Sequence, residues 1–377
     1  MSKRAATRRR KPRWWQRGSG IRLRVWMAGN LALLCVLTYG VMSALAAQAG
    51  GPRYAGLGQS AGVPALEELL RPEKKAHPMP DRAVFAKPNG KYFGVSTVES
   101  PWSGAELQRI KQSSGAWPTM SEYFVRWNAD FDPAAVKAAY DHGTLPVLAW
   151  EPWAGEEAGG DDQPEYRLST IIDGTHDAYI HAFARGVAQQ RWPLAIRFAH
   201  EMNGTWYPWS EQKNGNRRGQ YVQAWRHVHD IFAQEGATNV IWVWSPNILR
   251  PVPDVDLAAL YPGDDYVDWA GMVGYGTNSE RTADETFGPT LDALRGVTKK
   301  PVLITETGRE TSSAYKPAWT SDFFAWLAKQ PDVIGFIWFQ RNADQGAKAN
   351  WRFDETTAAL RAFSNGIRQI KLADGLD

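Results

Sequence analysis

The stretch Ile196–Trp209 reads IRFAHEMNGTWYPW, and it combines a buried strand with a polar end. A mostly apolar run finishes at Ala199, and His200, Glu201 and Asn203 follow directly. A continuous apolar run of this kind is typical of a strand that is buried on both faces of a parallel sheet. The stretch therefore predicts a parallel strand whose carboxyl end carries a cluster of polar side chains.

Further runs of the same kind lie on both sides of this strand and alternate with helical patterns. Strands are expected at Tyr92–Thr97, Glu122–Trp127, Leu145–Trp150, Leu194–Ala199, Val240–Trp244, Val267–Gly274, Pro301–Thr305 and Val333–Phe339. Apolar spacing near 3.6 residues predicts helices at His176–Gln189, Arg218–Gln234, Lys316–Lys329 and Glu355–Ser364. Strand–helix alternation indicates a parallel sheet, and this number of strands fits an α/β fold of the (β/α)₈ TIM-barrel type better than a doubly wound sheet. Neither GxGxxG nor GxxxxGK[ST] occurs, which weakens nucleotide-binding alternatives.

Charge is divided unevenly along the 377 residues, whose net charge is +3. Residues 1–24 hold ten Lys and Arg side chains, and the first fifty residues contain no Asp or Glu. Residues 51–377 carry 33 basic and 40 acidic side chains, a net charge of −7. Recognition of nucleic acid needs clustered cations, so the acidic body argues against that function. The single cysteine, Cys35, excludes a disulfide, a thiolate metal site or a cysteine nucleophile within the body.

The basic tail 1–24 is followed by 23 uncharged residues, Val25–Ala47. As a helix this run would be roughly 34 Å long, enough to cross the core of a bilayer. Basic residues before a span stay in the cytoplasm, which places the body outside. Two interpretations of residues 25–49 stay open: an uncleaved signal anchor, which the length favours, or a signal peptide cut after the small residues near Ala49. We expect an extracytoplasmic body, either anchored in the membrane or secreted.

Residues 50–90 resemble a spacer, because six prolines and six glycines interrupt any periodicity. One short helix is expected within it, at Val63–Leu70. The catalytic domain is predicted to span residues 91–370.

A second glutamate follows the seventh predicted strand. The segment Pro301–Gly308 reads PVLITETG, and we expect the strand to finish at Thr305 with Glu306 at its edge. The carboxyl ends of the strands form the active-site face of a (β/α)₈ barrel, and strands four and seven lie across it from one another. Glu201 and Glu306 could thus flank one sugar ring, as the acid and the second carboxylate of a glycoside hydrolase do.

An alternative for Glu201 is a structural ion pair with Arg197. A carboxyl group buried beside aromatic rings, however, tends to hold its proton, which suits a general acid near neutral pH.

HEMNGTWYPW, followed about a hundred residues later by ITETG, resembles glycoside hydrolase family 26 over roughly residues 90–365. The resemblance implies a retaining mechanism with Glu201 as acid/base and Glu306 as nucleophile. It also implies that His200 matches the family's histidine before the acid/base. Tyr275, in VGYGTN, would hold the nucleophile, and Trp338, in FIWF, would form the floor under the reacting sugar.

Further residues at the predicted strand ends are candidates for binding sugar. Aromatic rings stack on pyranose faces, and ordinary core packing is the alternative for each ring. These candidate rings are Trp150, Trp153, Trp206, Trp209, Trp244 and Trp338. Asn203 and Asn247 could bind hydroxyl groups or stabilise loop turns. Glu151 could accept a substrate hydroxyl or pair with Arg126.

The leading hypothesis is an exported, membrane-tethered endo-β-glycanase that cleaves β-mannan or a β-1,4- or β-1,3-1,4-glucan. Mannan-cleaving relatives typically have a His near the position of Glu151, and WEPW and WYPW resemble the β-glucan-cleaving branch. The alternatives are a transglycosylase or trimming enzyme for the host's own exopolysaccharide, and a non-catalytic carbohydrate-binding barrel that would not need both glutamates. No cofactor, metal, nucleic acid or obligate protein partner is expected. The acidic loop around Asp162 has no EF-hand spacing.

Overall fold

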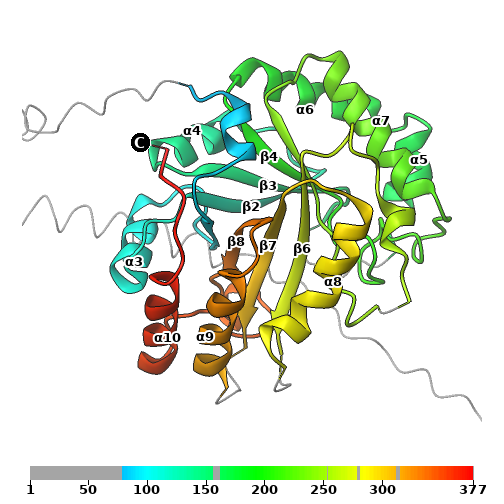
Figure 1. Ribbon diagram of the computed structural model, residues 1–377. Helices are drawn as coiled ribbons and strands as arrows, with labels where there is room; N and C mark the ends of the chain where they lie inside the picture. The colour runs from blue at the N-terminus through cyan, green and yellow to red at the C-terminus, as the bar shows by residue number, and fades with distance from the viewer. Residues whose placement is uncertain (1–78, 156–161, 253, 278–280, 311–314, 377) are drawn as a thin grey trace, which may run out of the picture. The chain divides into compact units, whose positions relative to one another are not determined.

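The computed structural model describes residues 79–155, 162–252, 254–277, 281–310 and 315–376. Within these ranges, eight parallel strands close into a barrel in the order β1 to β8, and helices surround it (Figure 1). The predicted (β/α)₈ fold is therefore confirmed. The tail 1–24, the segment 25–49 and most of the predicted spacer lie outside the described residues. No helix in the described ranges is both long and apolar enough to cross a membrane.

The strands match the sequence predictions closely at their starts and less closely at their ends. They are β1 (Tyr92–Ser96), β2 (Met120–Arg126), β3 (Leu145–Glu151), β4 (Leu194–Phe198), β5 (Val240–Trp244), β6 (Trp269–Gly276), β7 (Val302–Arg309) and β8 (Val333–Phe339). Strand β7 continues past Thr305 to Arg309. Glu306 therefore lies within the strand, whereas the sequence predicted that it would come directly after the strand's last residue. Strands β1, β3, β4, β5 and β7 are buried along their whole length, which explains their largely apolar sequences.

Helices connect the strands and cover the outside of the barrel (Figure 1). They are α3 (Gly104–Ser114), α4 (Pro133–Asp141), α5 (Leu168–Ile172), α6 (Asp177–Gln190), α7 (Gln220–Gln234), α8 (Ala283–Val297), α9 (Lys316–Leu327) and α10 (Thr357–Ile367). Four short 3₁₀ segments are also described: η1 (Arg82–Ala86), η2 (Pro164–Tyr166), η3 (Leu257–Leu260) and η4 (Ala343–Gln345). Side-chain caps fix several helix starts; Thr282, for example, forms a capping box with Glu285 at α8.

Residues 79–90, predicted as part of the spacer, are packed against the barrel. Phe85 in η1 is 1% exposed, and its carbonyl accepts a hydrogen bond from the hydroxyl of Tyr92. Arg82 forms an ion pair with Asp268. The body therefore begins before residue 91, because η1 buries an aromatic side chain that sequence periodicity could not assign to any strand or helix.

Candidate active site

Strands β4 and β7 bring Glu201 and Glu306 to the same end of the barrel. The backbone of Glu201 lies just after β4 in the left-handed region, with φ at +53°, and that of Ala199 has φ at +45°. Non-glycine residues rarely adopt this conformation, which is concentrated at functional sites. Hydrogen bonds hold it here, since Glu201 N donates to the carbonyl of Ser245 at 2.8 Å and Ala199 N to that of Trp150 at 3.1 Å.

A bulge in β7 orients Glu306. Met272 pairs with Ile304 and the next residue, Val273, pairs with Glu306, so Thr305 is the extra residue. The hydroxyl of Thr305 lies 2.6 Å from that of Ser245. Without the bulge, strand alternation would place the next inward-facing side chain at a different position along β7.

Both carboxylate oxygens of Glu306 accept hydrogen bonds. Arg197 Nη1 donates to Oε1 at 2.9 Å, and the hydroxyl of Tyr275 donates to Oε2 at 2.6 Å. Burial alone would lower the pKa of Arg197, but the carboxylates of Glu122 and Glu306 outweigh that effect and raise it. The predicted partnership of Tyr275 with Glu306 is thus present in the structure. Among the described residues Arg197 forms its ion pairs with Glu306 and Glu122, rather than with Glu201 as the alternative supposed.

Glu201 lies in an environment that favours its protonated form. The residue is 8% exposed, and burial raises its pKa to about 7, with the carboxylate of Glu306 adding to the rise. Hydrogen bonds from Asn247 Nδ2 to Oε1 and from Trp206 Nε1 to Oε2, each 2.5 Å, act in the opposite direction. Burial and the charge of Glu306 thus both favour the protonated form of Glu201, which is the form that a general acid needs.

Local packing fixes the two residues that donate to Glu201. A Cβ at Gly204 would lie 2.4 Å from the ring of Trp206, so only glycine lets this ring lie across the backbone. Asn203 and Asn247 bind one another through two hydrogen bonds: Asn203 Nδ2 to the carbonyl of Asn247 at 2.9 Å, and Asn247 N to Asn203 Oδ1 at 2.8 Å. Asn203 is buried and acts as a support for Asn247, which fits the loop-stabilising role of the two that the sequence left open.

His200 and Glu151 line the site beneath the loop that follows β4. The imidazole is 1% exposed between the rings of Phe124, Tyr207 and Trp209. Burial lowers the pKa of His200 well below its usual range, and Arg197 adds to this effect, so the ring is neutral. Its Nε2 lies 3.9 Å from Glu151 Oε1.

Burial raises the pKa of Glu151 to about 7. Trp153 Nε1 donates to its Oε2 at 3.0 Å, and Arg126 Nε is 3.7 Å from the same oxygen. The alternative pairing of Glu151 with Arg126 is therefore realised, and Trp153 also lies at the site, with the Arg126 guanidinium over its ring.

The candidate tryptophans divide into two groups. Trp206 and Trp153 contact the carboxyl groups, and Trp209 is buried behind them, stacked on Tyr207 with its Nε1 on the carbonyl of His200. Trp150, Trp244 and Trp338 are fully buried on the outer side of their strands. Trp150 packs on Phe183 and Phe232 of the covering helices, and Trp244 on Tyr261.

Trp338 does not form the predicted floor under the sugar. Its ring packs on Phe323 of α9 and Phe363 of α10, outside the barrel. The neighbouring Phe339 instead points into the barrel mouth, where it contacts Phe124 and Tyr275. Successive side chains alternate across a strand, so assigning the floor to Trp338 selected the wrong face of β8.

Four residues that border the site were not predicted from the sequence. Glu122 on β2, Phe339, Arg341 and Trp351 all border the site: Arg341 lies over the rings of Phe124 and Phe339, and the ring of Trp351 contacts that of Tyr275 at 4.5 Å between centroids. Glu122 could have been noticed, since it is the first residue of the predicted strand Glu122–Trp127, and an acidic residue in a buried strand is uncommon.

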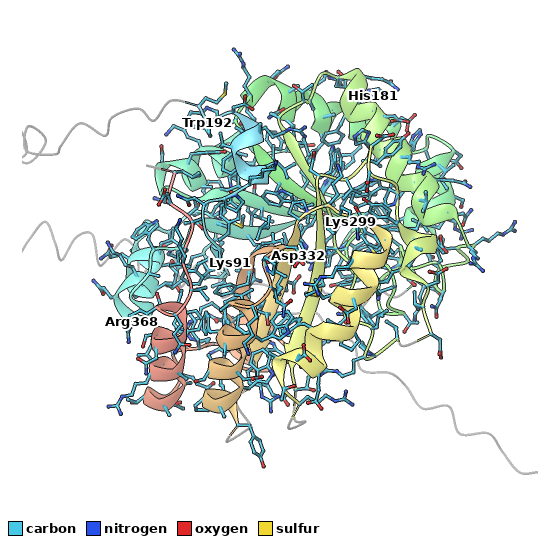
Figure 2. All side chains as sticks on the ribbon, viewed as in Figure 1. Lys91, His181, Trp192, Lys299, Asp332 and Arg368 are labelled. Atoms are coloured by element: carbon cyan, nitrogen blue, oxygen red, sulfur yellow. The ribbon has the colours of Figure 1, made fainter. Side chains whose placement is uncertain are left out.

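Two cavities lie near the barrel ends. One is a hollow of about 290 Å³ lined by Met202, Asn203, Glu211, Gln212, Arg218, Asp254, Val255, Asp256, Ala259 and Leu260, and Glu201 is not among its lining residues. A larger one, about 620 Å³, lies at the opposite end of the barrel, where Lys91, Lys299 and Asp332 line it (Figure 2). The larger cavity is remote from the carboxyl groups and is not part of the site. No group of three or more His, Cys, Asp or Glu within the described ranges is arranged to hold a metal ion.

The described residues thus form a closed (β/α)₈ barrel with one buried glutamate after β4 and a second within β7. The model of "Glycosyl hydrolase family 26" matches residues 163–338. Endoglucanase H of Acetivibrio thermocellus is 29% identical over 293 residues, which cover 74% of this chain and 30% of that protein. The mannan endo-1,4-beta-mannosidase of Bacillus subtilis strain 168 is 29% identical over 263 residues, 62% of this chain and 69% of that protein. These matches support the resemblance of this chain to glycoside hydrolase family 26.

Solved structures agree on the fold. A GH26 beta-mannanase from Bacteroides ovatus superposes with a TM-score of 0.56 at 19% identity, covering 74% of this chain and 88% of that one. Bacillus subtilis mannanase gives 0.52 at 21% identity, with coverage of 69% and 84%. The chain spans about a third of the length of the first curated relatives it matches, endoglucanase H and a mannosidase of Caldalkalibacillus mannanilyticus.

Proposed function

We propose that this chain is a retaining endo-β-glycanase in which Glu306 is the nucleophile and Glu201 the acid/base. The observation that carries the proposal is that the surroundings of the two glutamates favour different ionisation states. Glu306 is held by Arg197 and Tyr275, donors that favour a carboxylate, whereas burial keeps a proton on Glu201. Pairs of carboxyl groups whose surroundings separate their protonation states mark the acid and the nucleophile of glycosidases.

The mechanism follows from this arrangement. Glu306 attacks the anomeric carbon while Glu201 gives its proton to the departing glycosidic oxygen, and a glycosyl ester forms on Glu306. Glu201 then takes a proton from water, which displaces Glu306 from the sugar. Tyr275 and Arg197 fix both oxygens of the nucleophile, so little reorientation is needed before attack.

The substrate class we propose is a β-linked glucan or mannan. Support comes from two relatives: endoglucanase H aligns with 74% of this chain, and the Bacillus subtilis mannan endo-1,4-beta-mannosidase with 62%. Rings at the mouth suit a neutral sugar, since Trp206 is partly exposed beside Glu201 and Phe339 partly exposed beside Tyr275.

A digestion panel with the full chain tests the proposal. It should contain mannans, β-1,4-glucan, mixed-linkage β-1,3-1,4-glucan, xylans and the host's exopolysaccharide. We expect oligosaccharides from a glucan or a mannan, and Glu306→Ala should reduce that activity more than a hundredfold with the fold intact by circular dichroism. Retention of more than a hundredth of the activity would overturn the role of Glu306. Lengthened products without net hydrolysis would favour the transglycosylase alternative.

We further propose that residues 25–47 tether the enzyme to the membrane, with its catalytic body on the outer side. The support is the sequence alone: 23 uncharged residues after a tail with ten basic side chains. Fractionation of cells that express the full chain tests this. Full-length protein in the membrane fraction that is digested by external protease supports a tether, and release of a chain beginning near residue 50 would support a cleaved signal instead.

A further inference from the structure

Glu122 and Glu306 share a single guanidinium at the base of the site. Arg197 Nη1 donates to Oε1 of both carboxyl groups. The side chains of Arg197 and Glu122 are wholly inaccessible, and Glu306 is 7% exposed. This cluster therefore places two acids and one cation in the interior of the barrel, where an unbalanced charge is costly.

Glu122 is poorly satisfied as a carboxylate. Its Oε2 has no hydrogen-bond partner within the described part of the chain, and neither do Nε and Nη2 of Arg197. Two carboxylates that compete for one cation resist simultaneous ionisation. Burial raises the pKa of Glu122 to about 8; Arg197 opposes this rise and Glu306 adds to it. Glu306 accepts hydrogen bonds from two donors and Glu122 from one, so the geometry favours the carboxylate at Glu306 and the proton at Glu122.

Arg341 is the other cation that faces Glu122, from the segment after β8. Its positive charge favours the ionised form of Glu122 and so opposes the rise in the pKa of that acid. Its Nη2, however, donates to the carbonyl of Thr97 at 3.0 Å, and its guanidinium lies over aromatic rings. In the described structure Arg341 hydrogen-bonds to neither acid, so Arg197 remains their shared partner.

Formation of the glycosyl ester changes the charge balance of this cluster. A bond forms between a carboxylate oxygen of Glu306 and the anomeric carbon, and the glycosidic bond breaks with its electron pair on the departing oxygen, which takes the proton of Glu201. Glu306 is then neutral, and Arg197 has lost the anion that balanced it. Glu122 is the remaining acid in hydrogen-bond contact with Arg197.

We propose that Glu122 is a positioning residue that exchanges its charge with the nucleophile during turnover. It keeps a proton while Glu306 is a carboxylate, and releases that proton to solvent when Glu306 becomes an ester. When water cleaves the ester, Glu306 recovers its charge and Glu122 takes a proton back. Arg197 thus faces one anion at every stage. The inference rests on the proposed retaining mechanism.

Proton release on trapping tests the exchange. The full chain carrying Glu201→Gln is mixed with a 2,4-dinitrophenyl 2-deoxy-2-fluoro-β-cellobioside, or the mannobioside if the digestion panel identifies mannan. The leaving group departs as an anion and needs no acid, and the amide that replaces the carboxyl group of Glu201 does not titrate. Trapped sites are counted from dinitrophenolate, and protons from an indicator dye in weakly buffered solution near neutral pH. We expect close to one proton per trapped site.

The matched variant is Glu201→Gln combined with Glu122→Gln, which keeps the acceptor oxygen for Arg197 but has no proton to release. We expect less than a tenth of a proton per site from it. Equal release by the two proteins, or none from Glu201→Gln alone, overturns the charge exchange while the retaining mechanism stands. Absence of dinitrophenolate release from both and from the wild type overturns the retaining mechanism itself.

A second measurement needs no substitution at position 122. In the Glu201→Gln protein, proton release should decline as the pH is raised through about 8, because Glu122 is then already ionised before trapping. Release that stays constant from about one pH unit below this value to about one unit above it would contradict the proposal even if the double variant failed to fold.

Discussion

The hydroxyl of Tyr275 donates a 2.6 Å hydrogen bond to Oε2 of Glu306, from the neighbouring strand of the barrel. Arg197, on β4, donates a hydrogen bond to the other oxygen, Oε1. Residues of β4 and β6 therefore hold the carboxylate of Glu306, which lies at the bulge in β7. A nucleophile held from two sides has little freedom to rotate, and its charge is stabilised before substrate arrives.

Tyr275→Phe should therefore lower kcat without unfolding the protein. A hydrogen bond to a charged group contributes about 1.5–3 kcal/mol, which corresponds to a loss of roughly 10- to 100-fold in kcat. The measurement is steady-state kinetics on the polysaccharide that the digestion panel identifies. Tyr179→Phe is the control, because Tyr179 lies on α6 and its hydroxyl bonds to the carbonyl of Ala129 away from the site. An equal loss of kcat in both variants would argue against a specific role for Tyr275.

Glu201→Ala should be rescued by azide. The variant lacks the acid and the base, so a substrate with a good leaving group still forms the ester on Glu306 but water removes it slowly. Azide needs no general base and enters the space that the carboxyl group vacates. We expect a β-glycosyl azide by NMR, because two inversions retain configuration. An α-azide would contradict the assignment of Glu306, and the double variant Glu201→Ala, Glu306→Ala should give no azide product.

Asn247→Ala should move the alkaline limb of the activity profile to higher pH. The acid form of Glu201 is the active one, so kcat/KM should fall as the pH rises through about 7. Asn247 Nδ2 stabilises the ionised form, and its removal raises the pKa of Glu201 further. The measurement is kcat/KM over about two pH units on each side of neutrality. The control is Trp192→Phe, before β4 at the other end of the barrel, which should leave the alkaline limb at the same pH. An alkaline limb that moves to lower pH in Asn247→Ala would refute the stabilising role of Asn247.

The sequence predicted the barrel and its two glutamates well, since long apolar strands carry a strong pattern and polar residues at their ends interrupt it. The side on which each ring lies was harder to predict. The bulge at Thr305 and the left-handed residues Ala199 and Glu201 change the direction of side chains by local backbone geometry, which no apolar periodicity records. The buried acid Glu122 was missed for a related reason: its partner, Arg197, is 75 residues away in sequence.

The opposite orientations of Phe339 and Trp338 on β8 can be tested directly by substitution. Phe339→Ala removes a ring from the mouth, and we expect KM to rise roughly 3- to 10-fold, as for an aromatic contact of about 0.5–1.5 kcal/mol, with little change in stability. Trp338→Ala should instead cost about 3–5 kcal/mol in the free energy of unfolding, because it empties a packed site between β8 and α10. Urea denaturation and steady-state kinetics on both variants check the pair. A stable Trp338→Ala protein with a raised KM would restore Trp338 as the floor of the site.

Buried glutamates should make the protein more stable on the acid side of neutrality. Burial raises the pKa of Glu122 to about 8 and those of Glu151 and Glu201 to about 7, above the ordinary value of 4.5. The folded state then binds these protons more tightly than the unfolded state, so the stabilisation is complete below about pH 4.5 and is lost as the pH rises through 7 to 8. Neutral, buried His200, whose pKa is lowered, acts in the opposite direction, so a single curve mixes both effects.

Glu151→Gln isolates one of these contributions, because glutamine imitates the neutral acid and does not titrate. We expect the variant to lose less stability than the wild type as the pH rises from mildly acidic to mildly alkaline, and the difference in unfolding free energy between the two proteins to change through about pH 7. Urea denaturation at several pH values measures it, with the exposed Glu165→Gln as control. If the two curves stayed parallel over this range, Glu151 would not hold a proton in the folded protein, and burial would not be the factor that sets its ionisation.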